Sequence, residues 1–202
     1  MRKYIITIFL IVTYSGYSFA QKQTSILFIG NSLTYTNDLP ELVTDEALKN
    51  GHDVITEMVA KPNYALMDHW ADGKIQKLMR INDYDYVVIQ QGPSSQAYGR
   101  QLLIDYAQKL SELCEKYDCQ LAIFMVWPSR TYYHTFDGVI ESHKLAAEAT
   151  GAILCPVGEK WKAHFDSTKN FDFYGPDGFH PSQKGSARAA EIIVETLFSN
   201  EN

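Results

Sequence analysis

The stretch Ser25-Ile-Leu-Phe-Ile-Gly-Asn-Ser-Leu33 decides the fold that the sequence predicts. Its first part, Ser25 to Ile29, is a short and mainly apolar run, as in a strand that is buried on both faces of a parallel sheet. Gly30 permits a tight exit from that strand, and a nucleophilic side chain, Ser32, follows two residues later. The sheet edge at which this strand ends is therefore the first place to expect a site.

Similar apolar runs recur along the chain and alternate with segments of helical period. The expected strands are Ser25 to Ile29, Asp53 to Val59, Tyr84 to Gln90, Gln120 to Val126 and Ala152 to Pro156. The expected helices are Pro40 to Asn50, Leu66 to Arg80, Gln101 to Lys116, Asp137 to Thr150 and Ser182 to Phe198. This alternation predicts an α/β fold, with helices on both faces of one parallel sheet and a ligand site beyond the carboxyl ends of its strands.

The first twenty residues have the pattern of a signal peptide. Arg2 and Lys3 give a positive start. The apolar run from Tyr4 to Tyr14 is too short to span a bilayer. In Ser18-Phe19-Ala20, small residues occupy the two positions that a signal peptidase recognises. We therefore expect this segment to be removed and residues 21–202 to form a single exported domain, periplasmic or secreted, without a membrane anchor. An uncleaved anchor is the alternative.

The charge of the mature chain narrows the class of partner. Arg2 and Lys3 are the only charged residues before residue 21, so 16 basic residues remain against 24 acidic ones and the formal charge is −8. A surface of this sign argues against nucleic acid or an anionic membrane as the main partner. With 46% hydrophobic residues and no repeat, the chain is suited to one domain with a full core.

The cysteines and histidines leave a disulfide open and indicate no metal site. Cys114 and Cys119 could bridge the turn between a helix and a strand, or these two and Cys155 could all be buried thiols. No Cys-x-x-Cys pair or His-Glu-x-x-His segment occurs. Asp68-His69-Trp70 and His164-Phe165-Asp166 lack a coherent third ligand, so we expect neither a metal nor a cofactor.

A second chemical signal lies near the end of the chain, in Asp177-Gly-Phe-His-Pro181. A carboxylate three residues before an imidazole, across a glycine turn, can reach Nδ1 and leave Nε2 free to accept a proton from a serine. This segment alone is typical of a surface loop, and Gly30-Asn-Ser32 alone is typical of a strand-to-helix turn. Together they predict that Ser32 is a nucleophile, with His180 as its base and Asp177 orienting the imidazole.

These motifs resemble those of the SGNH, or GDSL-like, hydrolases. That family places its nucleophile in Gly-Asp-Ser-Leu, matched here by Gly30-Asn-Ser-Leu33 with Asn for Asp, and ends in Asp-x-x-His, matched by Asp177 and His180. The resemblance covers nearly the whole mature chain. It implies a three-layer α/β/α fold with a five-stranded parallel sheet of flavodoxin-like order, and ester hydrolysis through an acyl-enzyme without a cofactor.

The two middle motifs depart from the family pattern. Its members supply a Gly after the second strand and an Asn in Gly-x-Asn-Asp after the third, which form an oxyanion hole with the serine amide. Here these places read Ala60-Lys-Pro-Asn-Tyr64 and Gln91-Gly-Pro-Ser-Ser95. Asn63 and Gln91 can donate an amide hydrogen there, and we expect them to act with the Ser32 amide. The possible substitutes are Gln90 and Ser94.

The substrate class is indicated by resemblance alone. The segment after the third strand is similar to the Gln-Gly-Glu-Ser segment of carbohydrate-acetylesterase branches, which implies a small-molecule or polysaccharide ester with an acetyl or other short acyl group. The alternatives are a lysophospholipase or thioesterase, and a catalytically silent carbohydrate-binding protein. Four rings follow the fourth strand: Trp127, Tyr132, Tyr133 and His134. They would suit the face of a sugar ring at the same sheet edge, although core packing explains Trp127 equally well.

Overall fold

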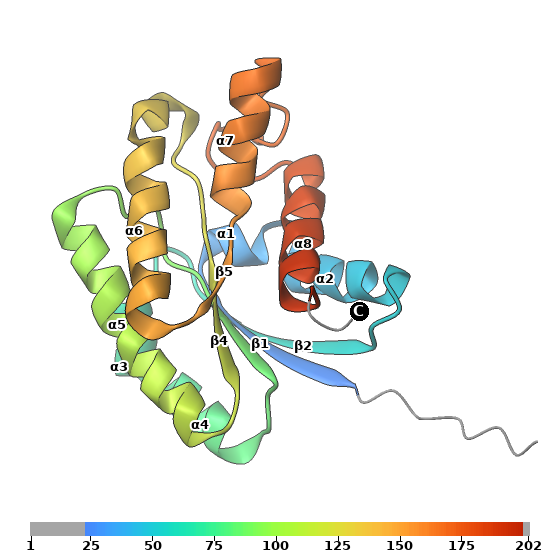
Figure 1. The fold of residues 1–202 in the computed structure, drawn as a ribbon, viewed down its shortest axis with the longest axis vertical. Helices are drawn as coiled ribbons and strands as arrows, with labels where there is room; N and C mark the ends of the chain where they lie inside the picture. The colour runs from blue at the N-terminus through green and yellow to red at the C-terminus, as the bar shows by residue number, and fades with distance from the viewer. Residues whose placement is uncertain (1–22, 200–202) are drawn as a thin grey trace, which may run out of the picture.

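The computed structural model describes residues 23–199 and contains one parallel sheet with helices on both faces (Figure 1). The strands are β1 (Thr24–Gly30), β2 (Val54–Ala60), β3 (Tyr86–Ile89), β4 (Gln120–Phe124) and β5 (Ile153–Cys155). The helices are α1 (Ser32–Tyr35), α2 (Leu39–Lys49), α3 (Leu66–Asp72), α4 (Lys74–Ile81), α5 (Ala97–Lys116), α6 (Phe136–Thr150), α7 (Val157–Thr168) and α8 (Gln183–Leu197), with 3-10 segments at Thr36–Asp38 and Arg130–Thr135. The segment expected to be a signal peptide lies outside the described residues.

The strand order is β2-β1-β3-β4-β5, and every neighbouring pair is parallel. The three-layer α/β/α architecture and the flavodoxin-like order are therefore confirmed. Gly30 pairs with Ala60, and Ile29 pairs with Ile89, so β1, β2 and β3 end at nearly the same level. The residues that follow these three strands consequently meet at one edge of the sheet.

Successive side chains of β1 enter two different cores. Ile26 and Phe28 pack in the core that α2, α7 and α8 cover, whereas Leu27 and Ile29 pack in the core that α3, α4 and α5 cover. All four side chains are fully buried. A strand with a core on each face needs apolar residues at every position, which explains the unbroken apolar run in the sequence.

The helix predicted for Leu66 to Arg80 is in fact two helices. Gly73 has a φ of 70° and lies between the end of α3 and the start of α4. A residue in the left-handed region cannot continue an α-helix, and glycine adopts this conformation at little cost. The apolar pattern still runs through the break, because Leu66 of α3 and Ile75 of α4 are buried in the same core.

The sequence prediction missed α7. Its buried stripe consists of Val157, Trp161 and Phe165, which are four residues apart and give only a narrow apolar signal. The helix is nevertheless well anchored, because the Trp161 ring stacks on the Trp127 ring with their centroids 3.6 Å apart. Trp127 is therefore a core residue, the second of the two roles considered for it.

The three cysteines are thiols in this structure. Asp118, with a φ of 54°, ends α5 in the left-handed region, and the Cys119 amide donates to the Cys114 carbonyl over 3.1 Å. This is the Schellman arrangement, which brings the side chains at those two positions together. Cys114 and Cys155 are buried, whereas Cys119 is half-buried, so the expectation of three buried thiols holds for two of them. Within residues 23–199, no helix is long and apolar enough to cross a membrane.

Candidate active site

Three side chains from opposite ends of the chain form a continuous hydrogen-bonded line. Ser32 is the first residue of α1, directly after β1, whereas Asp177 and His180 lie in the loop between α7 and α8. His180 Nε2 lies 2.9 Å from Ser32 Oγ, and His180 Nδ1 lies 2.5 Å from Asp177 Oδ2. With the Nδ1 hydrogen held by the carboxylate, Nε2 is left to accept the serine proton.

The Asp177 carboxylate is held by its own loop. Its Oδ1 accepts hydrogen bonds from the amides of Phe179 and His180, each over 2.9 Å. The hydrogen bond from the His180 side chain, with further help from these amides, lowers the pKa of Asp177 below its ordinary value. The group is therefore an ionised acceptor at neutral pH, as the orientation of the imidazole requires.

The turn that precedes the nucleophile is fixed by two buried side chains. Gln90 Oε1 accepts from the Asn31 amide and from Thr34 Oγ1, each over 2.9 Å. His69 Nε2 lies 2.7 Å from the Gly30 carbonyl oxygen, and burial lowers the pKa of His69, so the ring is neutral and Nε2–H donates. A Cβ on Gly30 would lie 2.2 Å from Thr34 Oγ1, so glycine is required here.

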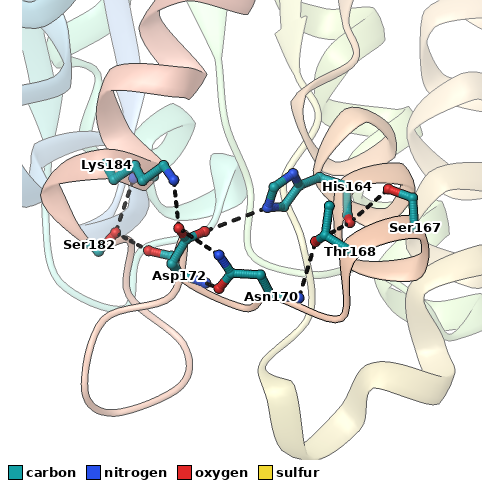
Figure 2. Close-up of polar contacts among 8 residues, drawn as sticks. His164, Ser167, Thr168, Asn170, Asp172, Ser182 and Lys184 are labelled. Atoms are coloured by element: carbon teal, nitrogen blue, oxygen red, sulfur yellow. Dashed lines mark hydrogen bonds and ion pairs between the residues drawn. The ribbon is translucent and has the colours of Figure 1, made fainter.

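The loop that carries Asp177 and His180 is closed at its base by a polar cluster (Figure 2). Asp172 Oδ2 accepts from Lys184 Nζ over 2.6 Å, and the Asp172 carbonyl accepts from Ser182 Oγ over 2.6 Å. These contacts join the start of the loop to the start of α8, so the loop returns to a fixed point.

Within residues 23–199, no group of three or more His, Cys, Asp or Glu side chains is arranged to hold a metal ion.

The top of the same loop is held by the segment after β4. Trp127 Nε1 donates to the Phe179 carbonyl over 2.9 Å, and the Arg130 amide donates to the Gly178 carbonyl over 2.7 Å. Because these two carbonyls immediately precede His180, the contacts limit how far the imidazole can move from Ser32. The sequence indicated either a ligand contact or core packing for Trp127, and this positioning contact could not be predicted from it.

The expected oxyanion donors differ in whether their N–H groups already donate hydrogen bonds within the protein. Ser32 and Asn63 line a cavity of about 350 Å³ beside the nucleophile, and Gln91 lines it as well. Gln91 Nε2, however, donates to Ser94 Oγ over 3.1 Å and to the Gly99 carbonyl over 3.3 Å, which occupies both of its hydrogens. The Asn63 side chain is exposed, and no hydrogen bond engages it among the described residues.

The two substitute donors are enclosed. Gln90 Nε2 is buried without a partner among the described residues, and its Oε1 is directed to the nucleophile turn. Ser94 is buried, and its Oγ donates to the Gly92 carbonyl over 3.0 Å. The backbone amide of Ser32 can donate to an oxyanion, because Ser32 is the first residue of α1 and the first amide of a helix has no acceptor within that helix. Ser32 and Asn63 are thus the better placed donors.

Known proteins share the fold that carries this site. No protein-family model and no curated protein matches the chain. A protein from Slackia heliotrinireducens that has been assigned to the SGNH hydrolases superposes with a TM-score of 0.74 at 26% identity, over 87% of this chain and 100% of that one.

Two more distant solved structures share the fold. A lipase/acylhydrolase from Enterococcus faecalis has a TM-score of 0.68 at 15% identity, over 87% of this chain and 96% of that one. A variant of an acetyl-xylooligosaccharide esterase from Geobacillus has a TM-score of 0.65 at 14% identity, over 88% and 96%. The chain therefore has the fold of the SGNH hydrolases, and its site has the geometry of a carboxylic ester hydrolase.

Proposed function

We propose that this protein hydrolyses carboxylic esters through an acyl-enzyme on Ser32. The observation that carries the proposal is the line from Asp177 through His180 to Ser32 Oγ, with contacts of 2.5 and 2.9 Å. Ser32 Oγ attacks the ester carbonyl carbon as its proton passes to His180 Nε2. The tetrahedral intermediate then collapses, the carbon–oxygen bond to the alcohol breaks, and His180 gives its proton to the departing oxygen.

The second half of the reaction repeats these steps with water. His180 accepts a proton from water, the hydroxide attacks the acyl carbon, and the free acid leaves as Ser32 Oγ recovers the proton. In both halves Asp177, ionised because its pKa is lowered by the His180 hydrogen bond, stabilises the imidazolium. We assign the developing oxyanion to the Ser32 amide and Asn63. Gln91 contributes only if it releases Ser94 or Gly99.

As substrate we propose an acetyl or other short acyl ester of a carbohydrate, met in the periplasm or outside the cell. The cavity of about 350 Å³ beside Ser32 has room for the acyl group. An acetyl-xylooligosaccharide esterase with the same fold makes this class reasonable. The alternatives are a lysophospholipase or thioesterase, which would prefer long acyl chains, and a carbohydrate-binding protein without catalysis.

The test is covalent labelling with a fluorophosphonate probe together with ester hydrolysis. We expect the wild-type protein to be labelled, and Ser32→Ala and His180→Ala to lose several powers of ten in kcat while remaining folded. Ser167→Ala is the matched control, because Ser167 is an exposed serine on α7. A wild-type protein that resists the probe and cleaves no ester would identify a binder, and labelling of Ser32→Ala would reject this nucleophile.

A further inference from the structure

A second cavity, of about 610 Å³, adjoins the catalytic one and shares Pro93 and Phe179 with it. It lies between the loop after β3 and residues 128–135 after β4. Its apolar surface comes from Pro93, Pro128, Tyr132 and Phe179. Because the two cavities meet at Phe179, one extended ligand can occupy both at the same time.

Two hydrogen bonds within the protein hold the walls of this second cavity. The Phe179 carbonyl accepts from Trp127 Nε1 over 2.9 Å, and the Pro128 carbonyl accepts from Tyr174 Oη over 2.8 Å. Both contacts lie in the protein interior, where Trp127 is fully buried and Tyr174 nearly so. Walls that hydrogen bonds within the protein hold in place need little ordering when a ligand binds, so they are suited to recognition.

The lining of the cavity defines the chemistry of its occupant. Beside the rings and prolines lie the hydroxyl groups of Ser129 and Thr135 and the amide of Gln96, whereas no Lys, Arg, Asp or Glu contributes. Tyr132 is 61% exposed, so its ring is accessible to a ligand. Apolar faces combined with uncharged hydrogen-bonding groups match a neutral sugar ring, which has C–H faces and hydroxyl groups at its edge.

Other occupants fit less well. A phosphorylated head group would find no Lys or Arg in the lining, where His134 is the basic side chain. A saturated acyl chain would cover the hydroxyl and amide groups without giving them hydrogen bonds, which is unfavourable for each group so covered. Of the rings that the sequence indicated for ligand contact, Tyr132 and His134 line this cavity. Tyr133 does not line it, and its hydroxyl donates to Asp166 over 2.7 Å.

The leaving alcohol of an ester bound at Ser32 would lie away from the oxyanion donors. His180 must give its proton to the departing oxygen, and the Phe179 ring, which borders both cavities, lies 5.1 Å from the His180 ring between centroids. The better placed oxyanion donors, Ser32 and Asn63, line the other cavity. We propose, on the basis of the proposed ester hydrolysis, that the second cavity is a glycosyl subsite in which an uncharged sugar ring of the alcohol packs against Tyr132.

Two esters of one acyl group test this subsite by kinetics. Acetylated xylobiose has a leaving alcohol large enough to fill the second cavity, whereas the ethanol of ethyl acetate is too small. We expect Tyr132→Ala to lower the ratio of kcat/KM for acetylated xylobiose to that for ethyl acetate about tenfold, mainly through KM. Tyr98→Ala, which alters a more exposed tyrosine that lines neither cavity, should leave the ratio unchanged.

A binding measurement separates this inference from the proposed catalysis. Calorimetric titration with unacetylated xylotriose should show binding to the wild type, Ser32→Ala and Tyr98→Ala, and about tenfold weaker binding to Tyr132→Ala. If the wild type cleaves esters but Tyr132→Ala changes neither the ratio nor xylotriose binding, the subsite is wrong and the hydrolase stands. Selective loss of p-nitrophenyl octanoate cleavage in Tyr132→Ala would assign the cavity to an acyl chain and overturn the inference. Xylotriose binding through Tyr132 without ester cleavage would reject the hydrolase alone.

Discussion

Asn31 shows why one residue of the Gly-Asp-Ser-Leu pattern differs here. Its Oδ1 accepts from the Leu33 amide over 3.2 Å, a capping contact that an aspartate would also make. Its Nδ2, however, donates to the Tyr64 carbonyl over 3.0 Å, and an ionised carboxylate has no hydrogen to give. The asparagine therefore ties the nucleophile turn to the loop that carries Asn63.

We expect Asn31→Asp to lower the free energy of unfolding by about 1–3 kcal/mol at pH 7, because a buried carbonyl then faces a carboxylate. Repulsion and burial raise the pKa of the new carboxyl, so the loss should shrink as the pH falls through that value and the group becomes a donor. Urea unfolding at several pH values measures this. Asn31→Ser also lacks the donor amide but carries no charge, so its loss should not vary with pH. A pH-independent loss in Asn31→Asp would contradict the argument.

At the residue scale, the sequence predicts the role of a side chain where a short local motif indicates that role. Ser32 lies at a strand end, and Asp177 and His180 lie three residues apart, and the structure places all three within hydrogen-bonding distance in one line. The role of His69 could not be predicted, because its acceptor is a backbone carbonyl 39 residues earlier. Gln91 was a reasonable donor by residue type, but its amide is used within the protein.

Gly73 provides a test at the scale of elements, because it separates α3 from α4. Its φ is 70°, and a Cβ added there would have no atom within 4 Å, so any cost of Gly73→Ala arises from the backbone alone. We expect a loss of about 1 kcal/mol in the free energy of unfolding, measured with urea.

Gly99→Ala is the matched control, because Gly99 lies in the first turn of α5 and a Cβ there would make only ordinary contacts, at 3.4 Å or more. This variant should be neutral or up to about 1 kcal/mol more stable, since alanine favours the helix. Equal losses in both variants would show that the left-handed backbone at Gly73 is not the cause.

The element boundaries show why apolar patterns overestimate strand length. The predicted third strand begins at Tyr84, but pairing begins at Tyr86. Tyr84 lies outside the sheet ladder and is buried because its ring packs in the core with Leu27 and Met79, and its hydroxyl donates to Glu57 Oε2 over 2.5 Å. Val126 is likewise buried beyond the end of β4. A sequence pattern reports burial, and pairing is a separate property that depends on the neighbouring strand.

At the scale of the whole molecule, the α/β class follows from the alternation of strands and helices, whereas the strand order came from the resemblance. Parallel strands end at a common edge, so the topology explains how Ser32 meets a histidine 148 residues later. The second cavity could not be predicted, because its walls come from two separate loops and its shape depends on contacts such as Trp127 to Phe179.

The stability of the whole molecule toward acid should depend on His143. This side chain is fully buried in α6, where Nδ1 donates to the Val139 carbonyl over 2.8 Å and Nε2 has no partner among the described residues. Burial lowers the pKa of His143 from 6.5 to about 4. The unfolded chain therefore binds a proton at a higher pH than the folded protein does, and folding stability falls as the pH drops from 6.5 toward 4.

Between pH 7 and pH 5, His143 should reduce the free energy of unfolding by about 2 kcal/mol. In His143→Gln no group titrates at this position, so the decrease over that interval should be smaller than in the wild type by about this amount, whatever the absolute stability of the variant. Urea unfolding of both proteins at the two pH values gives the comparison. His134→Gln, which removes an exposed histidine, should keep the wild-type dependence. Equal decreases in the wild type and His143→Gln would mean that the buried ring is not the group that makes the protein sensitive to acid.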